Sequence, residues 1–153
     1  MISPIIAELE DRGTLGIAAV SWSWLALAEV RIGNAVAGGM AAHTVLERAA
    51  GMEAYEATTR AHLALSEVSL ATADPDGAVA SAREAVAIAG GGDWLILNAE
   101  AQLALARALG AAGEVDAAES HARAAVDMFR AKEYVLGATA AEAFHRSLAL
   151  AQR

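Results

Sequence analysis

Residues 63–68 read LALSEV, and close copies of this hexapeptide occur three more times in the chain of 153 residues. The copies are LALAEV at 25–30, LALARA at 103–108 and LALAQR at 148–153. Residues two apart point about 200° apart around an α-helix, so Leu63 and Leu65 face opposite sides of it. A helix that is apolar on both sides has to be covered on both sides, which indicates an inner helix packed among several neighbours.

The composition indicates a single all-α domain spanning residues 1–153. Hydrophobic residues make up 56% of the chain and aromatic residues only 5%, and alanine is the commonest residue. Alanine combines a high helix propensity with a small side chain that lets helices approach closely. A chain of this length is sufficient for one core.

Charge, hydropathy and cysteine content argue against several classes of function. The net charge of −8 would repel a phosphate backbone, so we expect no direct binding of nucleic acid. The mean hydropathy is +0.37, yet no uninterrupted apolar run reaches the roughly 18–20 residues that a membrane span needs. The first residues, MISPIIAELE, lack the basic start of a signal peptide. We therefore expect a cytoplasmic protein that does not bind membranes, and the absence of cysteine excludes disulfides and thiolate metal sites.

Turn-forming residues divide the chain into segments of helical length. An Asp-Pro-Asp-Gly sequence occupies 74–77, a glycine-rich stretch occupies 90–93, and single glycines mark most of the other breaks. Between these breaks the residues lack the alternation that is typical of a β-strand. The pattern predicts helices at 3–12, 15–33, 36–50, 54–73, 76–90, 94–112, 115–131 and 134–151.

A 40-residue interval indicates that the helices are paired in repeating units. It separates Leu63 from Leu103, Arg83 from Arg123 and Val86 from Val126. Because one shift covers two helices and their turn, the repeating unit is a helical hairpin. LALAEV lies 38 residues before LALSEV, so we expect a first unit that is shorter or differs in its turn. LALAQR lies 45 residues after LALARA, which favours a closing helix, and the predicted units are 15–53, 54–93, 94–133 and the closing helix 134–152.

The unit that begins at Ala99 resembles the tetratricopeptide repeat, or TPR. Small or apolar residues stand where that family has them, at Leu105, Ala106, Leu109, Gly113, Val115, Ala118, Ala122 and Ala125. Gln102 and Ala122 stand where the family has aromatic residues, and the usual closing proline is absent. The resemblance implies a right-handed superhelical stack of antiparallel helical hairpins, an α-solenoid of about seven to eight helices.

The period of 40 residues is longer than that of the standard TPR unit. It is similar to the repeat regions at the carboxyl ends of bacterial LuxR-type and MalT-type regulators and of cyclase-associated ATPases, over most of residues 15–152. That likeness implies a sensory or regulatory role in transcription or signalling. The P-loop, the cyclase domain and the helix-turn-helix of those regulators have no counterpart in this sequence, so their activities are not implied.

The inner helices of such a stack would present charged and apolar side chains along one concave face. Charged groups on a curved apolar surface orient a partner segment through charge-assisted hydrogen bonds, while leucines contribute buried area. The predicted partner-binding residues are Trp22, Glu29, Arg60, Leu63, Glu67, Leu70, Glu100, Leu103 and Arg107. The alternative is purely structural: Glu67 and Arg107, at matching positions of adjacent units, pair with each other across the stack.

Three other patterns resemble parts of metal-binding or phosphate-binding sites, but none contains all the residues that such a site requires. Glu142 and His145 share one helical face as in di-iron bundles, but the second pair that such a site requires is missing. Separate predicted helices carry His43, His62 and His121, which favours solvated or hydrogen-bonded histidines over metal ligands. The glycine-rich segment 90–93 precedes a helix but follows another helix, so we interpret it as a linker in which Asp93 caps the next helix.

Aromatic residues and methionines near the ends of the array allow two interpretations. They either seal the core or anchor an interface, and the sequence favours neither for the aromatic groups. The aromatic residues are Trp22, Trp24, Phe129, Tyr134 and Phe144. Met40 and Met52 are more typical of core or contact filler than of a cofactor site.

Together these patterns predict a protein-interaction module with no enzymatic activity, no cofactor and no metal. The expected partner is a protein or peptide, and the excess apolar surface favours a homodimer or docking onto other domains of a larger regulator. One alternative is a sensor of a small-molecule effector, which an apolar pocket lined by Trp22 and inner-helix charges would favour. The other is an enzyme on a helical scaffold, which requires convergent ionisable groups with perturbed pKa values.

Overall fold

The computed structural model describes residues 15–151 and consists, within that range, of seven α-helices without any strand. The helices are α2 (Leu15–Arg31), α3 (Ala35–Ala49), α4 (Tyr55–Ala71), α5 (Pro75–Gly90), α6 (Leu95–Ala111), α7 (Val115–Ala131) and α8 (Val135–Ala151). Each begins and ends within two residues of its predicted position, and the prediction of an all-α stack is confirmed. The helix predicted at 3–12 lies outside the described residues.

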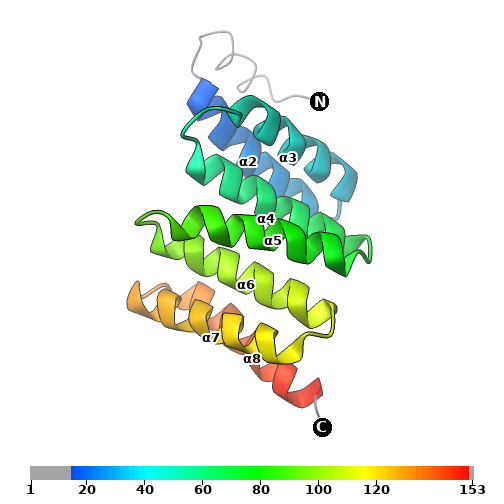
Figure 1. Cartoon of the computed structure of the whole chain (residues 1–153), viewed down its shortest axis with the longest axis vertical. Helices are drawn as coiled ribbons and strands as arrows, with labels where there is room; N and C mark the ends of the chain where they lie inside the picture. The colour runs from blue at the N-terminus through cyan, green and yellow to red at the C-terminus, as the bar shows by residue number, and fades with distance from the viewer. Residues whose placement is uncertain (1–14, 152–153) are drawn as a thin grey trace.

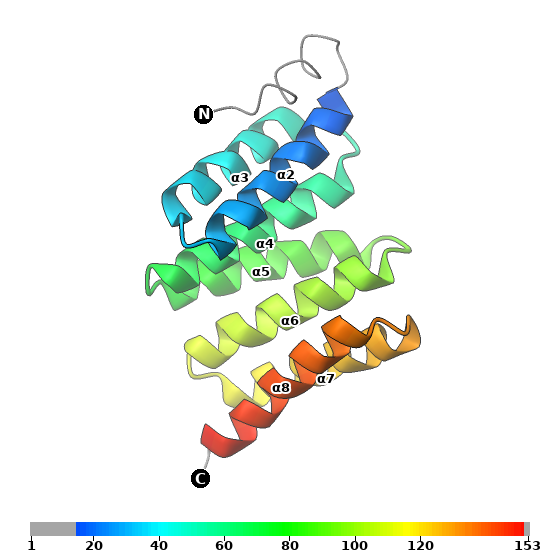
Figure 2. The same ribbon diagram turned by 180° about the vertical axis from the view of Figure 1, so that it is seen from behind.

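The helices follow one another along the long axis, with α2 and α3 at one end and α7 and α8 at the other (Figure 1). They form two layers, because α2 packs against α4, α4 against α6 and α6 against α8. Within the described range, no close contact joins α3 to α5 or α5 to α7. The even-numbered helices therefore form one continuous layer, which we call the inner layer, and Figure 2 shows its last member, α8, crossing in front of α7.

The 40-residue period holds along the whole described chain. Inner helices begin at Leu15, Tyr55, Leu95 and Val135, and the outer helices lengthen from 15 to 16 to 17 residues while the connections after them shorten. The first unit is therefore not shorter, and of the two predicted alternatives the second applies, because its connection to the next unit covers 50–54 whereas the following connection covers only 91–94. LALSEV and LALARA begin at the ninth residue of their helices, whereas LALAEV begins at the eleventh, so the first copy is displaced within a unit of ordinary length.

The turns from inner to outer helices share one backbone geometry. Their middle residues, Gly33, Ala73 and Gly113, have positive φ values of 90°, 58° and 83°. In each turn the next N–H donates to the carbonyl five residues earlier at 2.8–2.9 Å, which together with the positive φ defines a Schellman motif. In the first two turns this next residue, Asn34 or Asp74, also caps the following helix with its side-chain oxygen.

Small residues form most of the core and set the close spacing of the helices. More than twenty of the buried residues are alanines, and each alanine buries only a small apolar area. The helices therefore gain contact chiefly by packing closely against each other. At Gly38, for example, an added Cβ would lie 2.3 Å from Cγ2 of Val30 and 3.0 Å from the carbonyl oxygen of Ala26. None of the helices between residues 15 and 151 is long and apolar enough to cross a membrane.

Candidate functional site: the inner groove

Two adjoining depressions lie on the inner layer, and we call them together the inner groove. The first has a volume of about 560 Å³ and is lined by Trp24, Glu56, Arg60, Asp93, Trp94, Leu95, Ile96, Leu97, Glu100, Lys132 and Tyr134. The second has a volume of about 220 Å³ and is lined by Arg31, Leu63, Glu67, Glu100, Leu103, Ala104, Arg107, Phe129, Tyr134, Leu136, Gly137 and Ala140. Glu100 and Tyr134 belong to both, so the groove is continuous across α4, α6 and α8.

Six of the nine predicted partner-binding residues line this groove. They are Arg60, Leu63, Glu67, Glu100, Leu103 and Arg107, all from α4 and α6. Leu70 instead packs against the buried cluster that α5, α6 and α7 share. Trp22 and Glu29 line a separate cavity of about 320 Å³ between α2 and α3.

The misplacement of Trp22 and Glu29 has a geometric cause. Both positions were inferred by aligning LALAEV with LALSEV, and LALAEV is displaced by two residues in its helix. A shift of two residues turns a side chain by about 200°, to the other side of the helix. The positions of α2 that match Arg60 and Glu67 at the 40-residue interval are Val20 and Leu27. The groove is lined by Trp24 and Arg31, each about one helical turn further along the same side of α2.

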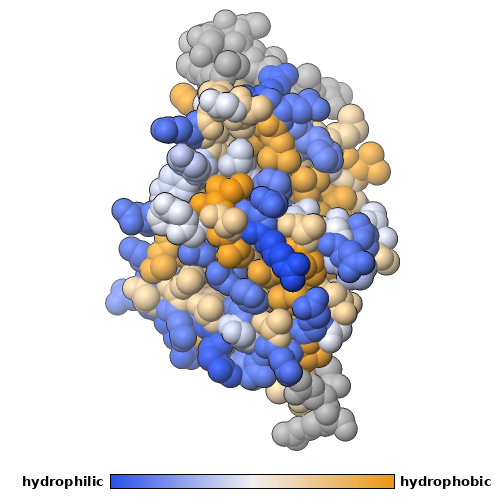
Figure 3. Space-filling model, viewed as in Figure 1, coloured by the Kyte–Doolittle hydropathy of each residue, from blue (hydrophilic) through white to orange (hydrophobic). Residues whose placement is uncertain are grey.

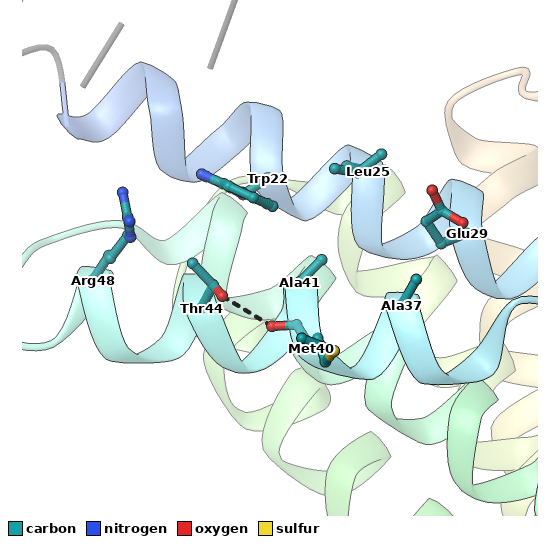
Figure 4. Close-up of a pocket in the computed structure, with 8 residues that line it drawn as sticks. All are labelled: Trp22, Leu25, Glu29, Ala37, Met40, Ala41, Thr44 and Arg48. Atoms are coloured by element: carbon teal, nitrogen blue, oxygen red, sulfur yellow. Dashed lines mark hydrogen bonds between the residues drawn. The ribbon is translucent and has the colours of Figure 1, made fainter. Parts of the chain in front are cut away.

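The cavity between α2 and α3 is a second candidate site (Figure 4). Trp22, Leu25 and Glu29 reach into it from α2, facing residues of α3 that include Met40 and Arg48. The hydroxyl of Thr44 on its wall donates to the carbonyl of Met40 at 2.9 Å. The cavity combines an indole ring with charged groups at its edges, although its volume is at the lower limit for small-molecule sites.

Arg60 is held rigidly at the centre of the first depression. The residue is only 9% exposed, and its guanidinium carbon lies 4.1 Å from the centroid of the Trp24 ring. One terminal nitrogen of the guanidinium donates to Glu56 one turn earlier, while Nε has no hydrogen-bond partner. A cation stacked on an indole and paired with a carboxylate has little freedom to move, so Arg60 forms part of the groove wall.

Glu67 pairs with a different arginine from the one predicted. Its carboxylate lies 3.6 Å from a guanidinium nitrogen of Arg31 in α2, and no ion pair joins it to Arg107 among residues 15–151. Arg107 is exposed on α6 and lines the groove without a recorded ion pair in that range. The predicted Glu67–Arg107 pair is therefore wrong, and one groove arginine is left available to other groups.

Glu100 is a half-buried carboxylate where the two depressions meet. Burial raises the pKa of its carboxyl group, Arg60 and Arg31 lower it, and Glu67 raises it further, with burial the largest effect. No hydrogen bond or ion pair is recorded for Glu100 within the described chain. Its charge is thus poorly solvated and is compensated only at a distance.

Partly exposed aromatic rings border the first depression. Trp24 is 50% exposed and Trp94 is 42% exposed, and Tyr134 lies on the boundary with the second depression. Trp94 rests against Tyr55 with the ring centroids 6.1 Å apart, and Tyr134 rests against Phe129 at 5.6 Å. Tyr55 and Phe129 thus restrict the orientations of Trp94 and Tyr134. A partner that binds to these rings would lose little side-chain entropy.

Trp94 was not anticipated from the sequence. Asp93 was expected to cap α6, but the N-cap is Trp94, without a side-chain cap hydrogen bond, so that prediction is wrong. The signal was its place in the repeat, because Trp94 and Tyr134 lie 40 residues apart, each immediately before an inner helix.

Glu142, His145 and His121, which were considered for metal chemistry, do not line the groove and contact other side chains. Glu142 accepts from Arg130 at 2.8 Å, and Nε2 of His145 lies 3.3 Å from Glu119. Nδ1 of His121 lies 2.6 Å from the Gln102 amide oxygen, and burial lowers the pKa of His121. Among residues 15–151 no three potential ligands gather in a way that would hold a metal ion.

In comparisons with known proteins, no protein-family model, no curated protein and no solved structure matches this chain. What the chain does therefore has to be inferred from its own groove.

Proposed function

We propose that this chain is a protein-interaction module that holds a segment of a partner protein in the inner groove. The single observation that carries the proposal is the combination of exposed aromatic rings with fixed charged groups along one continuous depression. Aromatic anchors beside desolvated charges are the features that carry binding energy in protein interfaces. By contrast, the face shown in Figure 3 intersperses hydrophilic and hydrophobic residues along its length.

The role of the module in a larger system is part of the same proposal. The resemblance of the sequence to the TPR and to the repeat regions of bacterial regulators supports a regulatory function in the cytoplasm, in which the module catalyses nothing itself. Docking to other domains of a regulator and formation of a homodimer both remain proposed. Light scattering over a dilution series tests the homodimer, and a monomer at every concentration contradicts it.

The binding test is a selection of random dodecapeptides displayed on phage, followed by calorimetry on the selected peptides. Leu136→Ala removes a 76% exposed side chain from the groove, and its matched control, Val36→Ala, removes a 77% exposed side chain from α3. We expect Leu136→Ala to weaken the selected peptides about tenfold, as for an interface anchor, and Val36→Ala to leave them unchanged. A selection without binders, or equal effects of the two variants, would contradict the proposal.

A second candidate function is the binding of a small effector in the cavity between α2 and α3. The observation that favours it is the indole of Trp22 beside Glu29 and Arg48 in a space of about 320 Å³. Screening small-molecule fragments by ligand-observed NMR tests it, with Leu25→Trp as the variant that fills the cavity. Fragment binding that survives Leu25→Trp would exclude this site.

A further inference from the structure

Among the three groove carboxylates that α4 and α6 carry, Glu100 is the one that forms no ion pair within residues 15–151. Glu56 pairs with Arg60, and Glu67 pairs with Arg31. For Glu100, the described chain supplies neither an ion pair nor a hydrogen bond, although both neighbouring arginines act on it through space. A partly buried carboxylate without a donor gains more from an added hydrogen bond than an exposed one does.

Glu100 also has the central position for contact with a bound segment. It lies where the two depressions join, with Trp24 and Trp94 on the walls of one and Leu103 and Leu136 on the walls of the other. A segment that crosses the groove would therefore place an apolar residue on either side of whatever group meets Glu100. The site therefore consists of one carboxylate between two depressions that can each accept an apolar side chain.

Building on the proposed function, we propose that the groove binds a basic segment, in which a lysine or arginine pairs with Glu100 and apolar residues on both sides of it occupy the two depressions. The charge of the chain supports this choice of partner, because a net charge of −8 attracts basic segments and repels acidic ones. The local charges agree with it. Arg60 and Arg31 are already paired, so a carboxylate brought to the centre of the groove would meet Glu100 without a free cation next to it.

The positions of the other groove cations indicate where acidic residues of the bound segment could lie, and they leave its centre for the basic residue. Arg107 lies about two helical turns along α6 from Glu100, and Lys132 lies in the connection before α8. An acidic residue near either of them would be tolerated at the edges of the segment. A cation at the centre and optional acidic groups outside it are therefore the expected pattern.

The test uses defined peptides, acetylated and amidated, with the sequences Leu-Ala-X-Ala-Leu and Leu-Ala-Ala-X-Ala-Ala-Leu, where X is Lys, Arg, Gln or Glu. Binding is followed by the indole N–H signals of Trp24 and Trp94 in two-dimensional NMR. We expect Lys and Arg peptides to bind about tenfold more tightly than the Gln peptide, and the Glu peptide to bind most weakly.

Two variants connect this preference to one residue. Glu100→Gln keeps the shape of the side chain and should remove the preference for Lys over Gln. Its matched control, Asp127→Asn, neutralises an exposed carboxylate of α7 outside the groove and should leave the preference unchanged. Circular dichroism of each variant verifies that the helices are intact.

The outcomes separate this inference from the proposed function. Three results would overturn the basic-partner inference alone. They are groove-dependent binding with no preference at X, a preference for Glu at X, and a preference for Lys that survives Glu100→Gln. If no peptide shifts either indole signal and the phage selection also yields no groove binder, both proposals are wrong. A Lys preference that only Glu100→Gln removes supports both.

Discussion

The guanidinium of Arg60 in α4 stacks on the ring of Trp24 in α2, with 4.1 Å between its carbon and the ring centroid. This contact joins two units of the repeat inside the groove. It also explains how a nearly buried arginine is tolerated, because the indole face and Glu56 compensate its charge where water is excluded. The geometry of the groove therefore depends on a contact between side chains of neighbouring inner helices.

A double-mutant cycle on Trp24→Leu and Arg60→Met should reveal this contact in the free energy of unfolding. We expect a coupling of about 0.5–2 kcal/mol, the range of partly desolvated cation–π pairs, from urea denaturation of the four proteins. The control cycle combines Trp24→Leu with Arg123→Met, since Arg123 pairs with Glu119 on α7 and is remote from the groove. Equal couplings in the two cycles would disprove a specific Trp24–Arg60 interaction.

Ala73→Gly should stabilise the protein. Ala73 adopts φ of 58° in a turn where Gly33 and Gly113 occupy the equivalent places, and a Cβ is disfavoured in that left-handed conformation. We expect a gain of about 0.5–1 kcal/mol in the free energy of unfolding, measured by urea denaturation. The control is Ala80→Gly, an exposed site within α5, which should lose about as much. Destabilisation by Ala73→Gly would contradict the strained-turn interpretation.

The adjacent glycines of α3 should respond in opposite directions to alanine. At Gly38 the new Cβ would overlap Val30, so we expect Gly38→Ala to cost about 1–3 kcal/mol through overpacking. At Gly39 the nearest atom to a new Cβ is Cγ1 of Val68 at 3.8 Å, an ordinary contact, so Gly39→Ala should gain about 0.5–1 kcal/mol of helix propensity. Thermal unfolding of both variants measures the difference, and stabilisation by Gly38→Ala would show that α2 and α3 are not in close contact at Gly38.

Glu100→Gln should increase stability near neutral pH. Burial raises the pKa of Glu100 in the folded protein, so folding disfavours its charged form and loses stability as the pH rises through that raised pKa. The gain from the substitution should therefore be largest at pH 7–8 and should disappear below the ordinary value of 4.5. The charges that act on Glu100 are those of Arg60, Arg31 and Glu67. The other charged and titratable side chains that line the groove are Glu56, Asp93, Arg107, Lys132 and Tyr134.

Urea denaturation of wild type and Glu100→Gln at a series of pH values measures this effect, with Asp127→Asn as the control. A difference between wild type and Glu100→Gln that does not vary with pH would show that Glu100 is not desolvated in the folded state.

The sequence sufficed for the helices because their boundaries are local. Glycine at the Schellman positions, Asn34 and Asp74 as caps, and the Asp-Pro start of α5 are all readable without knowledge of the packing. Six of the seven groove residues predicted on α4 and α6 were placed correctly, since LALSEV and LALARA occupy the same positions in their helices, and Leu70 is the exception.

The contribution of α2 to the groove was not predictable from the hexapeptide. Identical letters at a displaced position point to another side of the helix, so Trp22 and Glu29 line the cavity between α2 and α3. The residues of α2 that line the groove are Trp24 and Arg31. The pairing of charges was equally hidden. Because α4 packs against both α2 and α6, either neighbour could supply a cation to Glu67. The structure pairs Glu67 with Arg31 of α2, a choice that spacing along the chain does not encode.

As the outer helices lengthen, the connections after them shorten by the same number of residues, so the repeat length stays constant. This constancy has a consequence for the evolution and engineering of such a chain. Because every unit from one inner helix to the next contains 40 residues, deletion of residues 55–94 would join Ala54 directly to Leu95, the start of another inner helix. The array would lose one step and keep its turns, and duplication of the same segment would add one. The length of the inner groove, and with it the length of the proposed partner segment, is in this sense adjustable by whole modules without redesign of any single helix.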